Sequence, residues 1–284
     1  MPRRNLPVNP DVWAPRHLDL MGFWYHTLTD YVQRRISNQQ DILPAISGIA
    51  KIIAERSGYT YYAGLWLEDI HRGLLWQPLD VSKKSGRYKR PSWSWVSTDL
   101  PWIEMDDLRL HTYQPGPRAF VINMQVSTVG DDPYAKVLSS KLQLRGEVQT
   151  VGQLQAESKL IIFDNSHNYF TRMRVLNRWR KPEYVSQASI PPYHRIICHM
   201  DELNPLYEDQ IRTELQFNGA ILLVIAKFGH KWPPDVSKNA ATVFALVLQP
   251  TDFMEEEYER IGIAEMAEED FETIIWDERT ITII

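Results

Sequence analysis

Hydrophobic and polar positions follow two different periods along the chain, and the change comes after the first third. Before it, apolar side chains recur every three or four residues in the stretches 17–37 and 41–58, which predicts two amphipathic helices. Asp41 and Gly58 are suited to begin and end the second helix, as N-cap and as left-handed terminal residue. A third, shorter helix is predicted within residues 64–78. The inward stripe of the second helix is predicted to contain Leu43, Ile46, Ile49 or Ala50, and Ile53.

The rest of the chain alternates apolar and polar residues with period two, which predicts strands. The predicted strands are SWSWVS (92–97), RAFVINMQVSTV (118–129), KLQLRGEVQTV (141–151), KLIIFD (159–164), HRIICHM (194–200), AILLVIAKF (220–228), TVFALVLQP (242–250), EYERIGIAEM (257–266) and RTITII (279–284). No amphipathic helices alternate with these strands, so parallel β-α-β winding is not expected.

These patterns predict an α+β fold, in which an N-terminal helical layer packs on a C-terminal antiparallel β-sheet or barrel-like domain. Residues 1–82 are expected to form the helical subdomain and residues 83–284 the β-rich one, the two together making one structural unit.

Composition excludes several classes of protein. The 284 residues carry a net charge of −5, so there is no general attraction to nucleic acid or to anionic membranes. The longest apolar run, 220–226, is too short to span a membrane. The single cysteine, Cys198, cannot form an internal disulfide, and the N-terminus lacks the apolar run of a signal peptide. We therefore expect a cytoplasmic protein.

Common catalytic motifs are absent. The chain has no GxSxG, no P-loop and no GxGxxG, and its eight histidines lack the spacing of metal ligands. We expect neither a metal nor a cofactor. Cys198, in an apolar run, is predicted to be structural, and the acidic pair in GDDPY (130–134) is predicted to form a turn. The acidic segment 251–278 and the basic loop 83–90 are interpreted as solvated faces.

Ten tryptophans are the unusual feature of the composition. On a strand, Trp93 and Trp95 would share one face and make a wall of two indoles. Such a wall is either core or the floor of a ligand site. The densest group of titratable side chains is LEDIHR (67–72), where Asp69 or His71 is a candidate general acid or base. Glu68 and Arg72 of this group have the spacing of a helical surface pair.

Several separated stretches resemble the region that follows the heterokaryon-incompatibility (HET) domain in proteins of filamentous fungi. They are LPAISGIAKIIAERSGYTYYAGLWLEDIHRGLLWQ (43–77), RYKRPSWSWVSTD (87–99), DDPYAKVLSSKLQLRGEV (131–148), EEYERIGIAEM (256–266) and ERTITII (278–284). The resemblance spans Trp24 to Ile284 and implies a fungal source. The chain begins essentially where the HET domain would end, so the activity of that domain is not expected here. TDL (98–100) also stands where the family pattern has DG.

Two functions are compatible with these features. The first is a cofactor-independent cyclase of fungal secondary metabolism, a pericyclase (Diels-Alderase) or a catalyst of cationic cyclisation. It would hold an apolar small molecule in a dry aromatic pocket. The residues expected to line that pocket are Trp66, Trp76, Tyr88, Trp93 and Trp95. The residues expected to donate hydrogen bonds or move protons are Asp69, His71 and Arg72.

The alternative is a non-enzymatic regulatory or interaction module related to heterokaryon incompatibility. It would bind a protein partner through complementary charge and an exposed apolar patch.

Overall fold

The computed structural model describes residues 15–32, 34, 39–76, 91–98, 116–130, 132–156, 160–164, 195–200, 219–228, 241–251 and 256–284. Its helical elements are α1 (Pro15–Val32), η2 (Gln39–Asp41), α2 (Ile42–Ser57), η3 (Leu67–Asp69), α3 (Ile70–Gly73), η4 (Trp95–Ser97), α5 (Val151–Ala156) and α8 (Glu268–Phe271). Its strands are β1 (Tyr61–Tyr62), β2 (Leu65–Trp66), β3 (Gly116–Pro117), β4 (Phe120–Thr128), β5 (Val137–Thr150), β6 (Leu160–Asp164), β7 (Arg195–Met200), β8 (Ile221–Phe228), β9 (Thr242–Pro250), β10 (Glu257–Ala267) and β11 (Asp277–Ile283).

The two long helices form where the apolar spacing predicted them. Helix α2 buries one stripe, in which Ala50 rather than Ile49 takes the position that the sequence left open. Gly58 ends the helix with φ of 75°, and its N–H donates to the carbonyl of Ala54 at 2.8 Å. A residue with a side chain would be strained at that φ, so glycine is the natural terminator.

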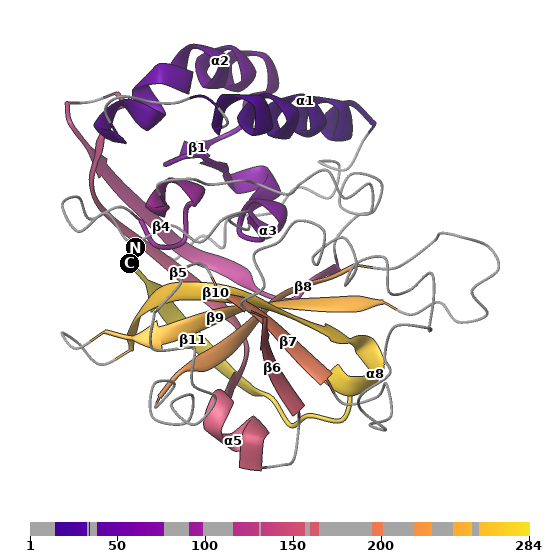
Figure 1. The fold of residues 1–284 in the computed structure, drawn as a ribbon. Helices are drawn as coiled ribbons and strands as arrows, with labels where there is room; N and C mark the ends of the chain where they lie inside the picture. Colours follow the sequence, from indigo (N-terminus) through magenta and orange to yellow (C-terminus); the bar gives the residue numbers. More distant parts are fainter. Residues whose placement is uncertain are drawn as a thin grey trace, which may run out of the picture.

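Nine strands of the described residues form one sheet, in the order β11-β5-β8-β9-β10-β7-β6 with β4 beside β5 and β3 beside β8. Strand β11 pairs with β5 along its length and also, in parallel, with the start of β10. The five strands β5, β8, β9, β10 and β11 therefore close into a ring (Figure 1). Most pairings are antiparallel, but β6–β7 and β10–β11 are parallel, so the sheet is mixed.

The central strands β8 and β9 are buried on both faces, as their almost continuous apolar sequences require. Alternate residues belong to two separate cores. Leu223 and Leu246 join the core that contains the helices and the tryptophans, whereas Leu222 and Val247 join a second core that includes residues of α5 and α8. The α+β class is thus confirmed, with helices and a large sheet in one chain.

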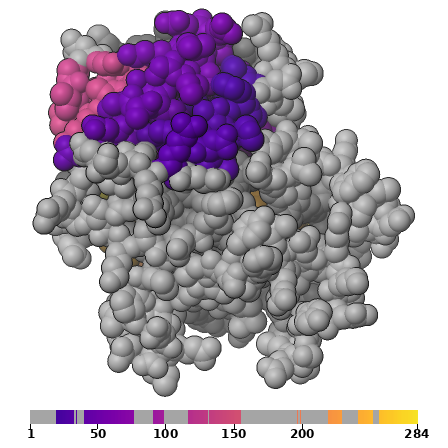
Figure 2. Space-filling model, turned by 45° about the horizontal axis from the view of Figure 1, so that its top comes forward, coloured from indigo at the N-terminus to yellow at the C-terminus, as the bar shows by residue number. Residues whose placement is uncertain are grey.

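The short elements β1, β2, η3, α3 and η4 lie between the two long helices and the sheet (Figure 1). We call this set the middle layer. Figure 2 shows the helical region as one continuous patch in the upper part of the view, with the β4–β5 hairpin in pink directly beside it. None of the helices in the described ranges is long and apolar enough to cross a membrane.

Eight of the nine predicted strands are present, and the exception is SWSWVS (92–97). This stretch forms a turn followed by the 3-10 helix η4. The reason is its serines: the Ser94 hydroxyl donates to the carbonyl of Ala63 at 2.5 Å and caps η4 by accepting from the Val96 N–H. A hydroxyl that bonds nearby backbone competes with the hydrogen bonds of a strand ladder. The third predicted helix is also shorter than expected, because residues 65–66 form β2 before the helical turns begin.

The turn between β1 and β2 leads to a matched pair of glycine substitutions. Gly64 has φ of 95°, and a Cβ there would lie 2.5 Å from Nε1 of Trp95. Gly64→Ala is therefore expected to lower the free energy of unfolding by about 2 to 4 kcal/mol, through backbone strain and overpacking. Gly48→Ala, in α2 with nothing within 4 Å, is the control and should be neutral or stabilising by up to about 1 kcal/mol. Urea unfolding measures both, and equal effects would contradict the close packing of Trp95 on this turn.

Candidate functional site

The four described tryptophans of the predicted pocket are all buried. Trp66, Trp76, Trp93 and Trp95 have at most 1% of their surface exposed. The indole N–H of Trp95 donates to the carbonyl of Gly64 at 2.9 Å, and that of Trp76 donates to the carbonyl of Trp93 at 3.0 Å. These bonds tie the SWSW stretch to the β1–β2 turn and to the end of the segment after α3. Tyr88, the remaining candidate, lies outside the described residues.

Asp69 is buried in the middle layer together with two polar partners. Its carboxylate accepts a hydrogen bond of 2.6 Å from the Tyr25 hydroxyl of α1 and lies 4.0 Å from Nε of Arg72. Burial and the negative charge of Asp69 raise the pKa of Tyr25 well above its ordinary value. The phenol therefore stays protonated and acts as a donor. Glu68 and Arg72 do not form the predicted surface pair, because Arg72 is buried while Glu68 binds the N–H and hydroxyl of Thr60.

His71 points to the sheet side of the layer. Its Nε2 lies 2.7 Å from the carbonyl oxygen of Ala119, just before β4. A carbonyl can only accept, so Nε2 carries the proton and the neutral ring is fixed in that tautomer. Burial lowers the pKa of His71, with an opposing effect from the Ala119 hydrogen bond. The imidazole is therefore neutral at pH 7 and acts as a link between α3 and the sheet.

Arg260 of β10 joins the middle layer to the sheet. Its Nη1 donates to the carbonyl of Leu74 at 2.7 Å, its Nη2 donates to the carbonyl of Trp76, and the guanidinium carbon lies 3.6 Å from the centre of the Trp76 ring. Its backbone N–H donates to the Ser92 hydroxyl, which in turn donates to the carbonyl of Ile284. We call this set of contacts the Arg260 clamp. A buried guanidinium needs acceptors for its several donors, and the carbonyls of the segment after α3 supply two of them.

Three indole N–H groups are buried without a hydrogen-bond partner among the described residues. They belong to Trp24, Trp66 and Trp93. The rings of Trp24 and Trp66 meet edge to face, with centroids 5.5 Å apart. Such a contact recovers only part of the free energy that a lost hydrogen bond costs, which is about 1 to 3 kcal/mol for a buried donor. Buried donors of this kind are the groups that an ordered water or a ligand acceptor satisfies.

Cys198 is buried, as predicted for a structural cysteine. Burial raises the pKa of its thiol to about 12, so it is not a nucleophile at neutral pH. Within the described ranges, no three His, Cys, Asp or Glu side chains gather as metal ligands would. Asp132 of GDDPY begins a turn: its carbonyl accepts from the Ala135 N–H at 3.0 Å and its carboxylate accepts from the Tyr134 N–H at 3.1 Å. Asp131, the other acidic residue of the predicted turn, lies outside the described residues.

The structure thus brings Asp69 and Arg72 together, directs His71 to the sheet, and distributes the tryptophans through the core around them. Sequence reasoning missed Arg260, Tyr25 and Ser92. A signal for Arg260 was available in the period of the strand. Arg260 lies two residues after Tyr258 and so shares its inward face, and a buried charge requires hydrogen-bond or ionic partners. Ser92 and Tyr25 had no such signal, because their partners are far away in the sequence.

Comparisons with protein families, with curated proteins and with solved structures found no match.

The position of His71 predicts a pH dependence of stability. Because its pKa is lowered in the folded state, the unfolded chain binds a proton more readily, and stability is lost as pH falls through the unfolded-state value of about 6.5. Each such group contributes a slope of at most about 1.4 kcal/mol per pH unit. His71→Gln, which retains a donor for Ala119 but does not titrate, should lose less stability between pH 7.5 and 5.5 than the wild type. Urea unfolding at both pH values measures the difference, and parallel losses would show that His71 does not carry it.

Proposed function

We propose that this chain is a non-enzymatic interaction module, related to the region that follows the HET domain in fungal proteins. The observation that supports this proposal most is that the candidate site residues serve to pack the core and to bond backbone. The tryptophans are sealed, and His71 donates to backbone rather than facing an open site. A protein built in this way acts through its surface, and we expect it to do so in the fungal cytoplasm.

Exposed apolar side chains on the β4–β5 hairpin suit such a role. Phe120 and Ile122 of β4 are 57% and 40% exposed, and Val129 and Leu138 near the hairpin tip are also exposed. Arg145 lies opposite Phe120 in the strand register, so apolar and charged groups adjoin there. Apolar side chains beside charge are typical of a surface that binds a protein partner.

A double substitution tests this surface. Phe120→Ser with Ile122→Ser should reduce capture of a partner from fungal extract at least about tenfold, since buried apolar anchors dominate binding energy. The melting temperature should change little, because both side chains are exposed. Ile275→Ser is the control, at an apolar position in the loop before β11 that is even more exposed, at 77%. Equal capture by wild type and double variant would refute the assignment of this surface.

A second candidate, the cofactor-independent cyclase, is supported by the three unpartnered indole donors. An apolar substrate with a carbonyl group would accept from such a donor, and indole faces would stabilise developing positive charge by about 0.5 to 2 kcal/mol each. In this function Trp66, Trp76, Tyr88, Trp93 and Trp95 line the site, while Asp69, His71 and Arg72 orient the carbonyl or move protons.

Native mass spectrometry distinguishes the two functions. If the second is correct, protein purified from a fungal host should carry a small molecule of a few hundred daltons. Trp66→Phe and Trp93→Phe, which remove the N–H and keep an aromatic ring, should lose it. Trp95→Phe is the control, because the N–H of Trp95 already donates to Gly64. Wild-type protein that carries no bound molecule, or one retained equally by all variants, would count against the cyclase.

A further inference from the structure

Strand β4 forms an edge of the sheet that the described strands build. It pairs with β5 along Phe120–Thr128, and none of the other described strands pairs with its opposite side. In such a strand, alternate residues direct their N–H and carbonyl groups away from the sheet, where they can bind another strand. The register of β4 is regular from Asn123 to Ser127, between its two irregularities. Five residues are a usual length for a paired strand.

The sequence of this edge does not oppose pairing with a second copy. FVINMQVST (120–128) contains no charged residue and no proline. Charged side chains and proline are the usual means by which an exposed edge is kept from pairing with its own copy. The irregularities at the ends of β4 limit the pairing segment to residues 123–127. Two copies of this segment bring no like charges opposite each other.

The side chains of the segment are arranged symmetrically around Gln125. Gln125 and Ser127 are exposed. Met124 is buried, and Val126 packs against the core that contains the helices and the tryptophans. If two copies pair antiparallel with Gln125 opposite Gln125, Met124 of one lies opposite Val126 of the other. Asn123 lies opposite Ser127 in the same way, so apolar residues meet on the inner face and uncharged polar residues meet on the outer face.

Exposed apolar side chains lie near both ends of the strand. Phe120 and Ile122 are exposed at its start, and Val129 and Leu138 are exposed close to its end. Antiparallel pairing brings the start of one strand beside the end of the other. The exposed apolar groups of one copy then lie near those of the second copy, which removes apolar surface from water.

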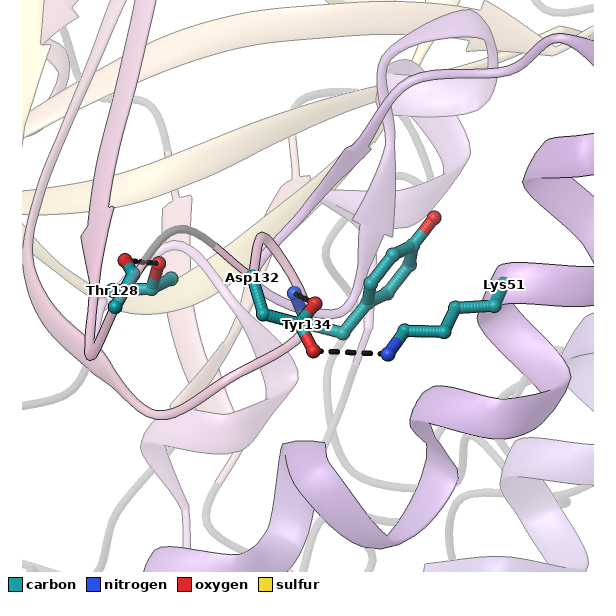
Figure 3. Close-up of polar contacts among 5 residues, drawn as sticks. Lys51, Thr128, Asp132 and Tyr134 are labelled. Atoms are coloured by element: carbon teal, nitrogen blue, oxygen red, sulfur yellow. Dashed lines mark hydrogen bonds and ion pairs between the residues drawn. The ribbon is translucent and has the colours of Figure 1, made fainter.

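The charges at the two ends of β4 are complementary in the same arrangement. Arg118 precedes the strand and lies 3.6 Å from Glu147, and its side chain is 38% exposed. Asp132 follows the strand and binds Lys51 at 2.9 Å, and its side chain is 47% exposed (Figure 3). An antiparallel copy brings the cation that precedes one strand toward the anion that follows the other, whereas a parallel copy brings like charges together.

We propose that β4 pairs with β4 of a second copy of this chain, antiparallel and centred on Gln125, so that the two sheets continue across a two-fold axis. The inference rests on the proposed function, because it uses the β4–β5 surface and names a second copy as the partner. An interface of one strand pair is small, so the dimer is weak and its population depends on concentration.

Sedimentation velocity of the purified protein tests the dimer. Between about 5 and about 300 µM, the wild type should change from mostly monomer to mostly dimer, as a weak interface does. Gln125→Lys and Gln125→Glu each place like charges opposite each other at the two-fold axis, and each should weaken association at least about tenfold. A 1:1 mixture of the two variants places opposite charges there and should restore association to within about threefold of the wild type.

Ser139→Lys mixed with Ser139→Glu is the matched control, because Ser139 is also exposed but lies on β5, one strand away from the edge. Neither control variant nor their mixture should change association by more than about twofold. Melting temperatures of all four variants should stay near that of the wild type, since both positions are exposed.

Three results would overturn the inference. A wild type that stays monomeric at the highest concentration, or a dimer that every variant retains, shows that β4 does not pair with its copy. Weakening by both Gln125 variants without recovery in the mixture shows that the strands are not antiparallel about this residue. If capture of another protein from fungal extract still depends on Phe120 and Ile122, only the self-pairing fails and the proposed function stands.

Discussion

The structure depends on the burial of one guanidinium. Arg260 enters the protein interior from β10. The carbonyls of Leu74 and Trp76 and the face of the Trp76 ring lie around its guanidinium and help to offset the free energy of removing the charge from water. Through Ser92 the same residue is bonded to the SWSW stretch and to the last residue of the chain. Three segments that are far apart in sequence therefore meet around one residue, and Trp76 of this region packs on its guanidinium.

The abundance of tryptophan has its physical explanation in this arrangement. A layer of short elements between two long helices and a sheet leaves irregular space, and large flat side chains fill such space while their N–H groups bind exposed carbonyls. Trp76 and Trp95 do both. Trp24, Trp66 and Trp93 also fill space, but their indole N–H groups have no hydrogen-bond partner among the described residues. They mark the part of the core where buried donors lack an acceptor.

The two boundaries of the middle layer differ in strength. Toward the sheet, the Arg260 clamp and the His71–Ala119 bond are buried, so water does not compete for them. Toward the β4–β5 hairpin, Tyr61 of the middle layer contacts the partly exposed Tyr134, and Lys51 of α2 forms an exposed ion pair with Asp132. Water and salt weaken exposed contacts of this kind, whereas they have little access to the buried contacts toward the sheet.

The periodicity of the sequence determined the two long helices, eight of the nine predicted strands and the inward stripe of α2, because local patterns of burial set these elements. The apolar run around Cys198 determined that this cysteine is buried, because a lone thiol among apolar neighbours packs as a small hydrophobic side chain. Only the tertiary structure decided the conformation of SWSWVS, the parallel pairing of β11 with β10 and the partners of Arg260, Tyr25 and Ser92. Each of these depends on a hydrogen bond to backbone or side chain distant in sequence. Such a bond leaves no periodic trace, and for that reason it becomes visible only when the chain is folded.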